Sequence, residues 1–525
     1  MAVYGIDLGT TYSCIACVDD VGRPTVLRNL EGSDTTPSVV YFESADGTVV
    51  GQSAKDAAVV DPEAVVQLIK RDMGEAVTRE FHGRSFTPEE ISARVLRKLA
   101  DDARISGGHE VRDVVITVPA YFGIAERDAT RKAGEIAGLR VLDVVAEPIA
   151  AALDYGALGA GADGGDRAIL VYDLGGGTFD TTVLTLRGTE LKVVCTDGAK
   201  ELGGSDWDDR LVLHLVDAFR TRFPDAGDPL ADPQTETQLR KDAEEAKKAL
   251  SFRGAYTVRV MHQGLVEPVE LTQELVEELT RDLLDRTVDL TRRTVELARE
   301  RGVAHFDDVL LVGGATKMPA VARRLREEFG FEPRLHNPDL AVARGASLYA
   351  LDRALYVINS GEMSAEEAPQ VPDTGRITHQ PYTISTVASR GYGIQVWDTT
   401  LEREYVTHLV HANDALPVAV VQDFYTIRAG QRKVDIKVME QAGAVESDEL
   451  GHNTVVADGT LDIPPDKPER WPIQCEFTLD TSGLLTVVAT ERETGERLTL
   501  TVRIGGMTEE AVEEARLSLT KERIA

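Results

Sequence analysis

A strand–turn–strand pattern at residues 168–186 constrains the fold more than any other part of the sequence. Apolar and β-branched runs flank a Gly-Gly-Gly turn at 175–177. Asp173 precedes this turn, and Thr178 and Asp180 follow it. A loop without side chains exposes its backbone N–H groups, and carboxylates at its edges suit a phosphate bound together with a divalent metal. Taken alone, the stretch is equally compatible with a Gly-rich hairpin that carries turn-favoured Asp and Thr.

The same order of features occurs at residues 3–18. A strand-like run ends at Asp7, a Gly-Thr-Thr turn follows at 9–11, and a second strand-like run completes the pattern. Two hairpins with the order strand, Asp, Gly, Thr, strand indicate two related halves that clamp one nucleotide between them. Neither loop is a P-loop, because no G-x-x-x-x-G-K-[ST] run is present and a strand follows the glycines.

Length and charge limit the classes of protein and partner. The 525 residues are too many for one core and indicate two or three domains. A formal net charge of −31 argues against nucleic acid or an anionic membrane surface as a partner. The sequence contains no apolar run of the ~18 residues that a transmembrane helix needs, and no signal-peptide pattern opens it.

The four cysteines are too few for a disulfide framework in a chain of this length. A reducing compartment therefore fits best, and we expect a cytoplasmic protein. Cys14 and Cys17 form a C-x-x-C within a strand-like run, where residues three apart face opposite ways. We expect two small core residues there rather than a redox or zinc pair.

Strands and helices alternate as far as about residue 355, a pattern typical of an α/β fold with mostly parallel sheets. Within this part the sequence predicts helices at 63–74 and 88–105. Glu147 stands where a predicted strand at 139–146 passes into a helix at 147–156. A carboxylate at that junction can cap the helix or order a water molecule.

The pattern changes after residue 355. A polar, acidic stretch broken by prolines is expected to be a linker, and short alternating strands with Gly, Asp and Pro turns follow it. The predicted segments are an α/β domain at 1–355, a linker at 356–385, a β-sandwich at 386–505 and a short helix at 506–525. The strands expected in the sandwich are 392–398, 404–411, 420–428, 432–440, 473–480, 483–491 and 496–504.

Nine short motifs are distributed along most of the chain. They are G-I-D-L-G-T-T-Y-S at 5–13, L-I-K-R at 68–71, V-P-A-Y-F at 118–122, A-E-P-I-A-A-A-L at 146–153, Y-D-L-G-G-G-T-F-D at 172–180, L-G-G-S-D-W-D at 202–208, E-E-A-K-K-A-L-S at 244–251, L-V-G-G-A-T-K-M-P at 311–319 and H-N-P-D at 336–339. Together they resemble the heat-shock-70 (DnaK-like) chaperone family. This resemblance implies an actin-like ATPase domain of two lobes, followed by an all-β sandwich that holds extended peptides.

The resemblance also implies how the nucleotide site divides its tasks. Asp7 and Asp173 would hold Mg²⁺ through its water shell, because this ion dehydrates reluctantly. Lys70 would neutralise the γ-phosphate and help to place the attacking water. Glu147 would order the surrounding waters. Asp180 would accept a proton or bind a monovalent cation such as K⁺.

Further residues are assigned to ATP or ADP through the same motifs. Thr10 and Thr178 would also supply catalytic hydroxyls near the γ-phosphate. The full nucleotide-binding set is Gly9, Thr10, Thr11, Tyr12, Gly175, Gly176, Gly177, Thr178, Gly204, Glu244, Lys247, Lys248, Ser251, Gly313, Gly314, Ala315, Lys317 and Asp339. Without the resemblance, the segment 244–251 is an ordinary solvated helix face. Lys70 and Glu147 would then be a surface lysine and a helix cap.

In the β-domain the resemblance places a peptide pocket on Ile394, Phe424, Val434 and Ile436. The plain interpretation of these four is sandwich core, because all of them stand at alternating positions. Extended-peptide recognition combines backbone hydrogen bonds with an apolar side-chain pocket, which gives wide substrate tolerance. We therefore expect unfolded or extended polypeptides as partners.

The chain departs from the family pattern at several places. A longer Pro-rich stretch replaces the family's short linker, and only residues 508–525 follow the β-domain, so we expect a divergent member that lacks the helical lid. Without a lid, trapped peptide should leave quickly. The family's J-domain docking positions carry Asp143, Ala146 and Ile149, which reverse one charge and remove polar groups. A J-domain partner is therefore disfavoured, whereas a nucleotide exchange factor remains compatible with the sequence.

The leading hypothesis is an ATP-hydrolysing, DnaK-like chaperone whose β-domain binds polypeptide under the control of hydrolysis. The alternative is a nucleotide-gated binding or scaffold protein with one dedicated partner and little turnover. A sugar kinase of the same superfamily is disfavoured by the β-domain.

Overall fold

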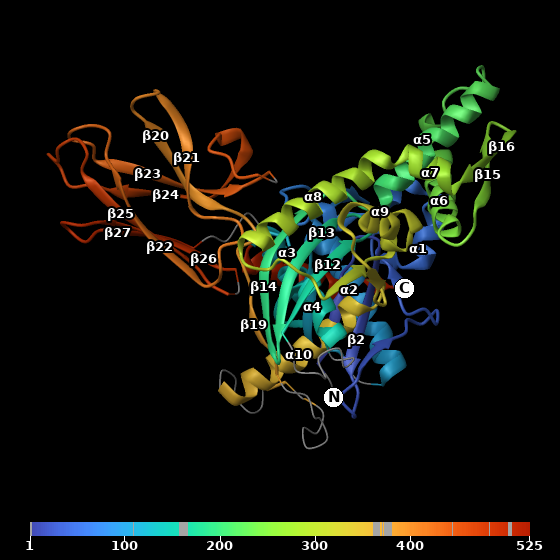
Figure 1. The fold of residues 1–525 in the computed structure, drawn as a ribbon, viewed down its shortest axis with the longest axis horizontal. Helices are drawn as coiled ribbons and strands as arrows, with labels where there is room; N and C mark the ends of the chain where they lie inside the picture. The colour runs from blue at the N-terminus through green and yellow to red at the C-terminus, as the bar shows by residue number, and fades with distance from the viewer. Residues whose placement is uncertain are drawn as a thin grey trace.

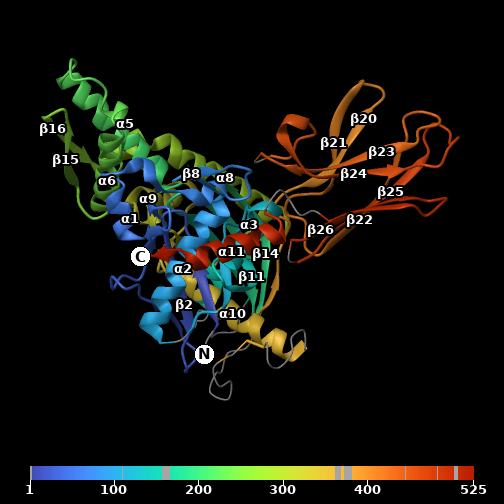
Figure 2. The ribbon, with the colours of Figure 1, turned by 180° about the vertical axis from the view of Figure 1, so that it is seen from behind.

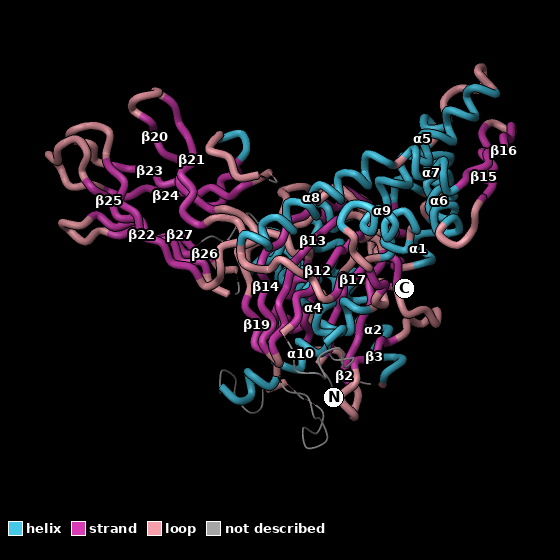
Figure 3. Tube along the Cα trace, in the orientation of Figure 1, coloured by secondary structure: helices cyan, strands magenta, loops and turns pink. Residues whose placement is uncertain are grey.

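The computed structural model describes residues 3–108, 110–156, 166–360, 368–369, 371, 381–443, 445–481, 483–501 and 507–525. Residues up to 385 form two six-stranded sheets with helices packed on them, and residues 392–501 form two four-stranded sheets (Figure 1). Helices gather almost entirely in the first part (Figure 3). This mixed architecture agrees with the predicted α/β part followed by an all-β part.

The first sheet has the strand order β11-β10-β1-β2-β3, with β4 paired to β2. Strands β1, β10 and β11 are parallel, whereas β2 runs antiparallel to β1. The bounds are β1 Tyr4–Asp7, β2 Tyr12–Val18, β3 Pro24–Leu27, β4 Thr36–Pro37, β10 Asp113–Val118 and β11 Arg140–Ala146. We call this sheet and its helices lobe I.

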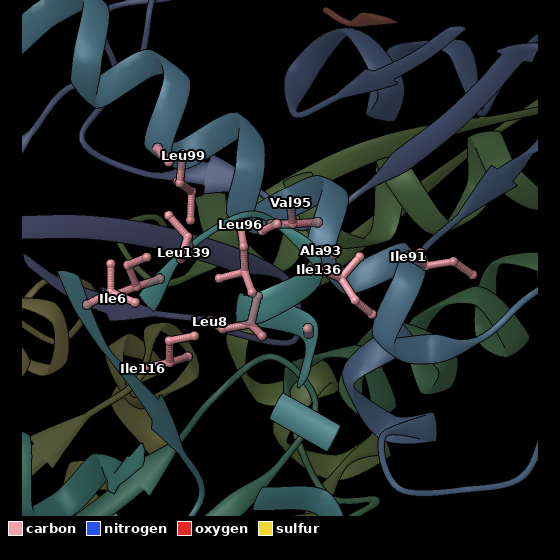
Figure 4. Close-up of a cluster of buried hydrophobic side chains, with 14 of the residues drawn as sticks. Ile6, Leu8, Ile91, Ala93, Val95, Leu96, Leu99, Ile116, Ile136 and Leu139 are labelled. Carbon is pink, nitrogen blue, oxygen red and sulfur yellow. The ribbon is translucent and has the colours of Figure 1, made fainter. Parts of the chain in front are cut away.

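Lobe I is held by one apolar cluster between its sheet and the helices α2 (Pro88–Gly107) and α3 (Ile124–Ile136). Ile6, Leu96 and Ile116 are fully buried within this cluster (Figure 4). Helix α2 begins at a capping box, in which Thr87 Oγ1 accepts from the Glu90 amide and the Glu90 carboxylate accepts from the Thr87 amide. The predicted helix at 88–105 is confirmed.

The second sheet has the order β18-β17-β12-β13-β14-β19, and β12 takes the place that β1 has in lobe I. Strand β12 pairs in parallel with β17 and antiparallel with β13, as β1 does with β10 and β2. The bounds are β12 Arg167–Leu174, β13 Phe179–Arg187, β14 Glu190–Ala199, β17 Asp308–Val312, β18 Pro333–Leu335 and β19 Thr383–Ser385. The two predicted hairpins therefore occupy equivalent positions in two related sheets. We call the second sheet and its helices lobe II.

Two helices cross between the two sheets, namely α4 (Glu147–Tyr155) and α10 (Ala341–Ser360). At the crossing Gly345 lies against Ala150, and a Cβ atom on Gly345 would come 1.6 Å from the Ala150 carbonyl oxygen. The helices therefore touch backbone to backbone at this point. Helices α8 (Arg281–Glu300) and α9 (Pro319–Phe329) complete lobe II.

Each lobe carries a smaller unit beside the cleft. In lobe I it consists of β5 Val40–Ser44, β6 Gly47–Val50, α1 Gln52–Ala57, β7 Val65–Val66, β8 Arg79–Phe81 and β9 Arg84–Phe86. In lobe II it consists of α5 Gly204–Arg222, α6 Pro233–Leu250, β15 Ala255–His262, β16 Leu265–Thr272 and α7 Gln273–Leu279.

The predicted helix at 63–74 is wrong. A 3-10 turn (Pro62–Ala64), the short strand β7 and a second 3-10 turn (Ile69–Asp72) stand in its place. Leu68 has a φ of 58°, in the left-handed region, and an α-helix cannot continue through that conformation.

The β-domain consists of two antiparallel sheets, β21-β20-β23-β24 and β22-β25-β26-β27, that share one apolar core. The bounds are β20 Tyr392–Asp398, β21 Arg403–Val410, β22 Val418–Tyr425, β23 Lys433–Gln441, β24 Asn453–Asp462, β25 Pro472–Leu479, β26 Leu485–Glu491 and β27 Arg497–Thr501. All seven predicted strands overlap observed ones. Strand β24 was not predicted.

The predicted linker at 356–385 is too long at both ends. Helix α10 continues to Ser360, and β19 already pairs with β14 at Thr383–Ser385. Most of the stretch between these elements lies outside the described residues. No described helix is both long and apolar enough to cross a membrane. The four cysteines are free, and Cys14 and Cys17 pack into different apolar clusters, as expected for core residues.

The C-terminal segment packs on lobe I rather than on the β-domain (Figure 2). Helix α11 (Glu509–Lys521) buries Val512 and Leu519 in the core cluster of lobe I, and β28 (Arg523–Ile524) adds a parallel strand to β6. Between them, Glu522 accepts from Arg94 Nε at 3.0 Å and from Thr48 Oγ1 at 2.8 Å.

The β-domain contacts both lobes. Arg390 donates to Glu126 of α3 at 2.6 Å and to Glu440 of β23 at 3.2 Å, so it joins the β-domain to lobe I. On lobe II, the Thr196 amide donates to the Asn413 side chain at 2.7 Å, and Arg301 donates to the Asn413 carbonyl at 2.6 Å.

Candidate nucleotide site

A cavity of about 790 Å³ lies between the two lobes, where the turns of both glycine hairpins meet. Most residues assigned to the nucleotide from the sequence line it. They are Asp7, Gly9, Thr10, Thr11, Tyr12, Lys70, Glu147, Asp173, Gly175, Gly176, Thr178, Gly204, Glu244, Lys247, Lys248, Ser251, Gly313, Gly314, Ala315, Lys317 and Asp339. Gly177 and Asp180 do not line it. The fold thus brings together residues from the whole length of both lobes.

The two hairpin turns press against each other, which explains their glycines. A Cβ atom on Gly176 would come 2.0 Å from Thr11 Oγ1, and one on Gly177 would come 2.3 Å from Thr10 Cγ2. Any side chain at either position would push the two lobes apart.

Two amides of the expected phosphate cradle are already bonded within their own hairpins. The Gly9 amide donates to Ser13 Oγ at 3.1 Å, and the Gly175 amide donates to the Thr178 carbonyl at 3.0 Å. Thr10 and Thr178 line the cavity and are 5% and 7% exposed. A phosphate would therefore be met by the remaining amides of the turns and by these two hydroxyls.

Asp7 and Asp173 end the equivalent strands β1 and β12 and face the same cavity. Burial, followed by repulsion from Glu147, raises the pKa of Asp7 to about 7 in spite of Lys70. Burial, Glu147 and Asp7 likewise hold the pKa of Asp173 well above its usual range. The site therefore concentrates buried negative charge that a cation would relieve.

Lys70 is the cation of this cluster. Its Nζ donates to Glu147 Oε1 at 2.6 Å, and both side chains are about 90% or more buried. Glu147 is the first residue of α4 and lies at the junction that the sequence predicted. The pair is thus neither a surface lysine nor a simple helix cap.

Asp180 lies behind the turn and not in the cavity wall. Its Oδ1 accepts from the Tyr121 amide at 3.3 Å, while its buried Oδ2 has no hydrogen-bond partner among the described residues. Burial and nearby carboxylates raise the pKa of Asp180 well above its usual range. Within the described residues, no group of three His, Cys, Asp or Glu side chains is arranged to hold a metal directly.

The α6 side of the cavity is a network of charged groups. Lys248 Nζ donates to Glu244 Oε1 at 2.6 Å and to the Tyr12 hydroxyl at 2.9 Å, and Lys55 pairs with the same carboxylate. Burial raises the pKa of Glu244, but Lys55 and Lys248 outweigh it and lower the pKa to about 2. Lys247 donates to the Gly204 carbonyl at 2.6 Å.

The opposite wall is formed by the turn after β17. A Cβ atom on Gly313 would come 2.4 Å from the Leu174 carbonyl oxygen, so this turn packs directly on the end of β12. Lys317 forms an ion pair with Asp339, and both residues line the cavity.

Several cations were not assigned from the sequence: Lys55, Arg240 and Lys241 line the cavity, and Arg71 contacts the hairpin turn beside it. Arg71 donates to the Gly177 carbonyl at 2.8 Å and to Asp206 at 2.7 Å, and so joins the two lobes at the hairpin turn. Lys55 lies on the short helix α1, and none of the residues around it in the sequence indicated that it belongs to the site. The only hint of Arg71 was its position beside Lys70.

The four residues assigned to peptide binding lie in the core of the β-domain. Ile394 and Ile436 are buried, whereas Phe424 and Val434 are partly buried against the same cluster. None of them lines the nucleotide cavity or a second cavity of about 640 Å³ between the lobes and the β-domain.

The residues that depart from the J-domain docking pattern line this second cavity. Asp143 accepts from the Tyr349 hydroxyl at 2.8 Å and pairs with Arg353 at 3.3 Å. Ile149 is buried, and Ala146 precedes α4. The reversed charge at Asp143 is therefore partnered within the chain.

Comparison with known proteins agrees with this architecture. The model of the Hsp70 protein family matches residues 3–82 and 75–525. Two curated relatives, the chaperone protein DnaK of two strains of Halobacterium salinarum, are each 36% identical over 522 residues. That alignment covers 98% of this chain and 77% of each relative. The chain therefore belongs to the Hsp70 family.

Proposed function

We propose that this chain is an ATP-dependent chaperone of the DnaK type. Its two lobes form an actin-like ATPase that hydrolyses ATP in the cavity between the glycine hairpins. Its β-domain binds unfolded or extended polypeptide. The observation that carries the enzymatic part is the buried Lys70–Glu147 pair, which lines that cavity together with Asp7 and Asp173. Membership of the Hsp70 family supports both parts.

The proposed reaction transfers the γ-phosphoryl group to water, which needs positioning and charge neutralisation more than covalent chemistry. Lys70 would neutralise the γ-phosphate and hold the attacking water. Glu147, already bonded to Lys70, would orient that lysine and the surrounding waters. Thr10 and Thr178 would donate hydrogen bonds to phosphate oxygens, and Asp180 would take up a proton or hold K⁺.

The chemistry of the donor set fits Mg²⁺. Asp7 and Asp173 are buried carboxylates with raised pKa values, so a cation between them would relieve repulsion. The lack of a third acidic or His ligand among the described residues favours a water-mediated site. When bound, Mg²⁺ would neutralise phosphate charge. The nucleotide set proposed from the sequence is otherwise retained, with the base along Glu244, Lys247, Lys248 and Ser251.

Coupling between the domains is supported by the contacts of Arg390 and Asn413. Each lobe has its own contact with the β-domain, so a rotation of one lobe against the other would strain one of them. ATP and ADP could then favour different arrangements of the β-domain. We propose Ile394, Phe424, Val434 and Ile436 as peptide-binding residues, exposed when the core cluster opens.

The proposal includes a cytoplasmic location, in line with the four free cysteines. A nucleotide exchange factor is a compatible partner. A J-domain partner is disfavoured, because Asp143 reverses the charge at its docking position. The proposed domain assignment keeps the α/β ATPase and the β-domain as separate units, and the short C-terminal segment packs on lobe I of the ATPase.

Single-turnover hydrolysis of Mg-ATP tests the enzymatic part. We expect Lys70→Ala to abolish turnover, whereas Lys192→Ala, an exposed lysine of β14, should leave it unchanged. Unchanged turnover in Lys70→Ala would contradict the proposal. Addition of an unfolded polypeptide separates the two hypotheses, because stimulated turnover supports the chaperone and indifference supports the nucleotide-gated scaffold.

A further inference from the structure

An exposed aromatic ring stands in the wall of the nucleotide cavity. Phe252 follows directly after α6, and its amide donates to the Ala249 carbonyl at 3.0 Å, which fixes the backbone at this point. Phe252 lines the cavity, as do Ser251 and Lys248. Phe252 is 82% exposed, whereas the other phenylalanines, all within the described part of the chain, are buried or partly buried.

The ring has no structural task that explains its position. In the part of the chain that the structure describes, Phe252 belongs to no apolar cluster and pairs with no other ring. Isolated exposed apolar residues are common on protein surfaces. This one differs because it faces a cavity of about 790 Å³ whose other walls hold phosphate-binding turns.

The other flat or charged groups of the cavity wall already have partners. The Tyr12 ring lies under the ammonium groups of Lys55 and Lys248, and Arg240 is paired with Asp209 and Glu236. Lys248 is paired with Glu244, and Lys317 is paired with Asp339. A lysine ammonium is a point charge and offers no flat face. A nucleotide whose phosphates lie at the glycine turns would extend its base along α6, towards the ring of Phe252.

We propose that Phe252 is the stacking platform for the base of the bound nucleotide. It would then determine the preference of the site for a nucleotide over a base-free polyphosphate. This inference rests on the proposed function, because it takes the cavity to be the ATP site. A base stacked on an aromatic side chain contributes enough affinity that its loss should raise Kd about tenfold.

Calorimetric titration with Mg-ATP and with Mg-tripolyphosphate tests the proposal. We expect Phe252→Ala to raise the Kd for ATP about tenfold and to leave the Kd for tripolyphosphate unchanged. Leu213→Ala, an exposed apolar residue of α5 outside the cavity, should change neither value. Phe252→Trp should retain ATP affinity, and its added indole fluorescence should be quenched when ATP binds.

Three results would contradict this inference. One is an unchanged Kd for ATP in Phe252→Ala. Another is an equal loss of affinity for ATP and tripolyphosphate, since that would place the defect at the phosphates. The third is a Phe252→Trp variant whose fluorescence ignores ATP. A wild-type chain that binds no Mg-ATP would instead contradict the proposed function itself, and this inference with it.

Discussion

The contact between the C-terminal segment and lobe I can be tested by removing one carboxylate. In the native chain the side chains of Arg94 and Glu522 are 3% and 4% exposed. Removing one partner of a buried ion pair costs ~3–5 kcal/mol, because the other charge stays buried without compensation. In Glu522→Ala the free-energy loss is smaller if the C-terminal segment undocks, because water then hydrates the charge of Arg94. The loss of stability therefore appears as undocking of the C-terminal segment rather than as unfolding of lobe I.

Hydrogen exchange measures this undocking directly. The Val50 amide donates to the Ala525 carbonyl at 3.0 Å, and the Ala525 amide donates to Thr48 at 3.0 Å, so both are protected only while β28 is paired. A loss of ~3 kcal/mol corresponds to exchange on the order of a hundredfold faster at these amides. The matched control is Glu514→Ala, which removes an exposed carboxylate from α11 of the same C-terminal segment.

A second variant separates the charge from the shape of the pair. Replacing both Arg94 and Glu522 by Met keeps most of the volume and removes both buried charges, so docking should largely recover. If Glu522→Ala exchanged no faster than Glu514→Ala, the buried pair would not hold the segment. The energetic reasoning would then be wrong.

Three further predictions follow from the site and the domain contacts. Gly177→Ala should not bind Mg-ATP, because its Cβ atom would lie 2.3 Å from Thr10 Cγ2 and force the two hairpins apart. Calorimetric titration measures this loss, and full affinity in the variant would contradict the hairpin contact. Arg390→Met leaves the carboxylates of Glu126 and Glu440 without their shared cation, which weakens the contact between lobe I and the β-domain. Small-angle scattering should then show a larger radius of gyration. An unchanged radius would mean that the Asn413 contact alone holds the β-domain in place. The Mg²⁺ concentration for half-maximal ATP binding should fall as pH rises from 6 to 8. Asp7 has a pKa of about 7 and must lose its proton to hold the cation. The pH dependence should therefore flatten in Asp7→Asn.

Local signals in the sequence predicted the parts of the fold that depend on neighbouring residues. Both hairpins combine apolar runs with glycine turns, so their strands and the positions of Asp7 and Asp173 could be predicted before the structure. The sequence did not predict strand β24, because Asp458 and Gly459, which lie inside it, are residues typical of a turn. In the structure a Cβ atom on Gly459 would come 2.9 Å from Leu500 Cδ2, so a larger residue there would require the leucine side chain to move.

Contacts between distant charged residues could not be predicted in this way. Lys55 and Glu244 are 189 residues apart, and each stands on an ordinary polar helix face. The contact between Arg71 and Gly177 uses a backbone carbonyl, which leaves no trace in the sequence. The docking of Glu522 on Arg94 likewise depends on how the whole chain returns to lobe I.

The crossing of α4 and α10 has a mechanical consequence. Small side chains such as Ala151 of α4 and Ala346 of α10 pack beside this close approach, so a rotation about it would displace few bulky groups there. Gly345 against Ala150 would thus serve as a pivot, and α1 and α6 lie away from α10 in both views (Figures 1 and 2). A small rotation there would be magnified where Lys55 meets Glu244, so breaking the ion pairs of the cavity wall would let the site admit ATP while both lobes stay folded.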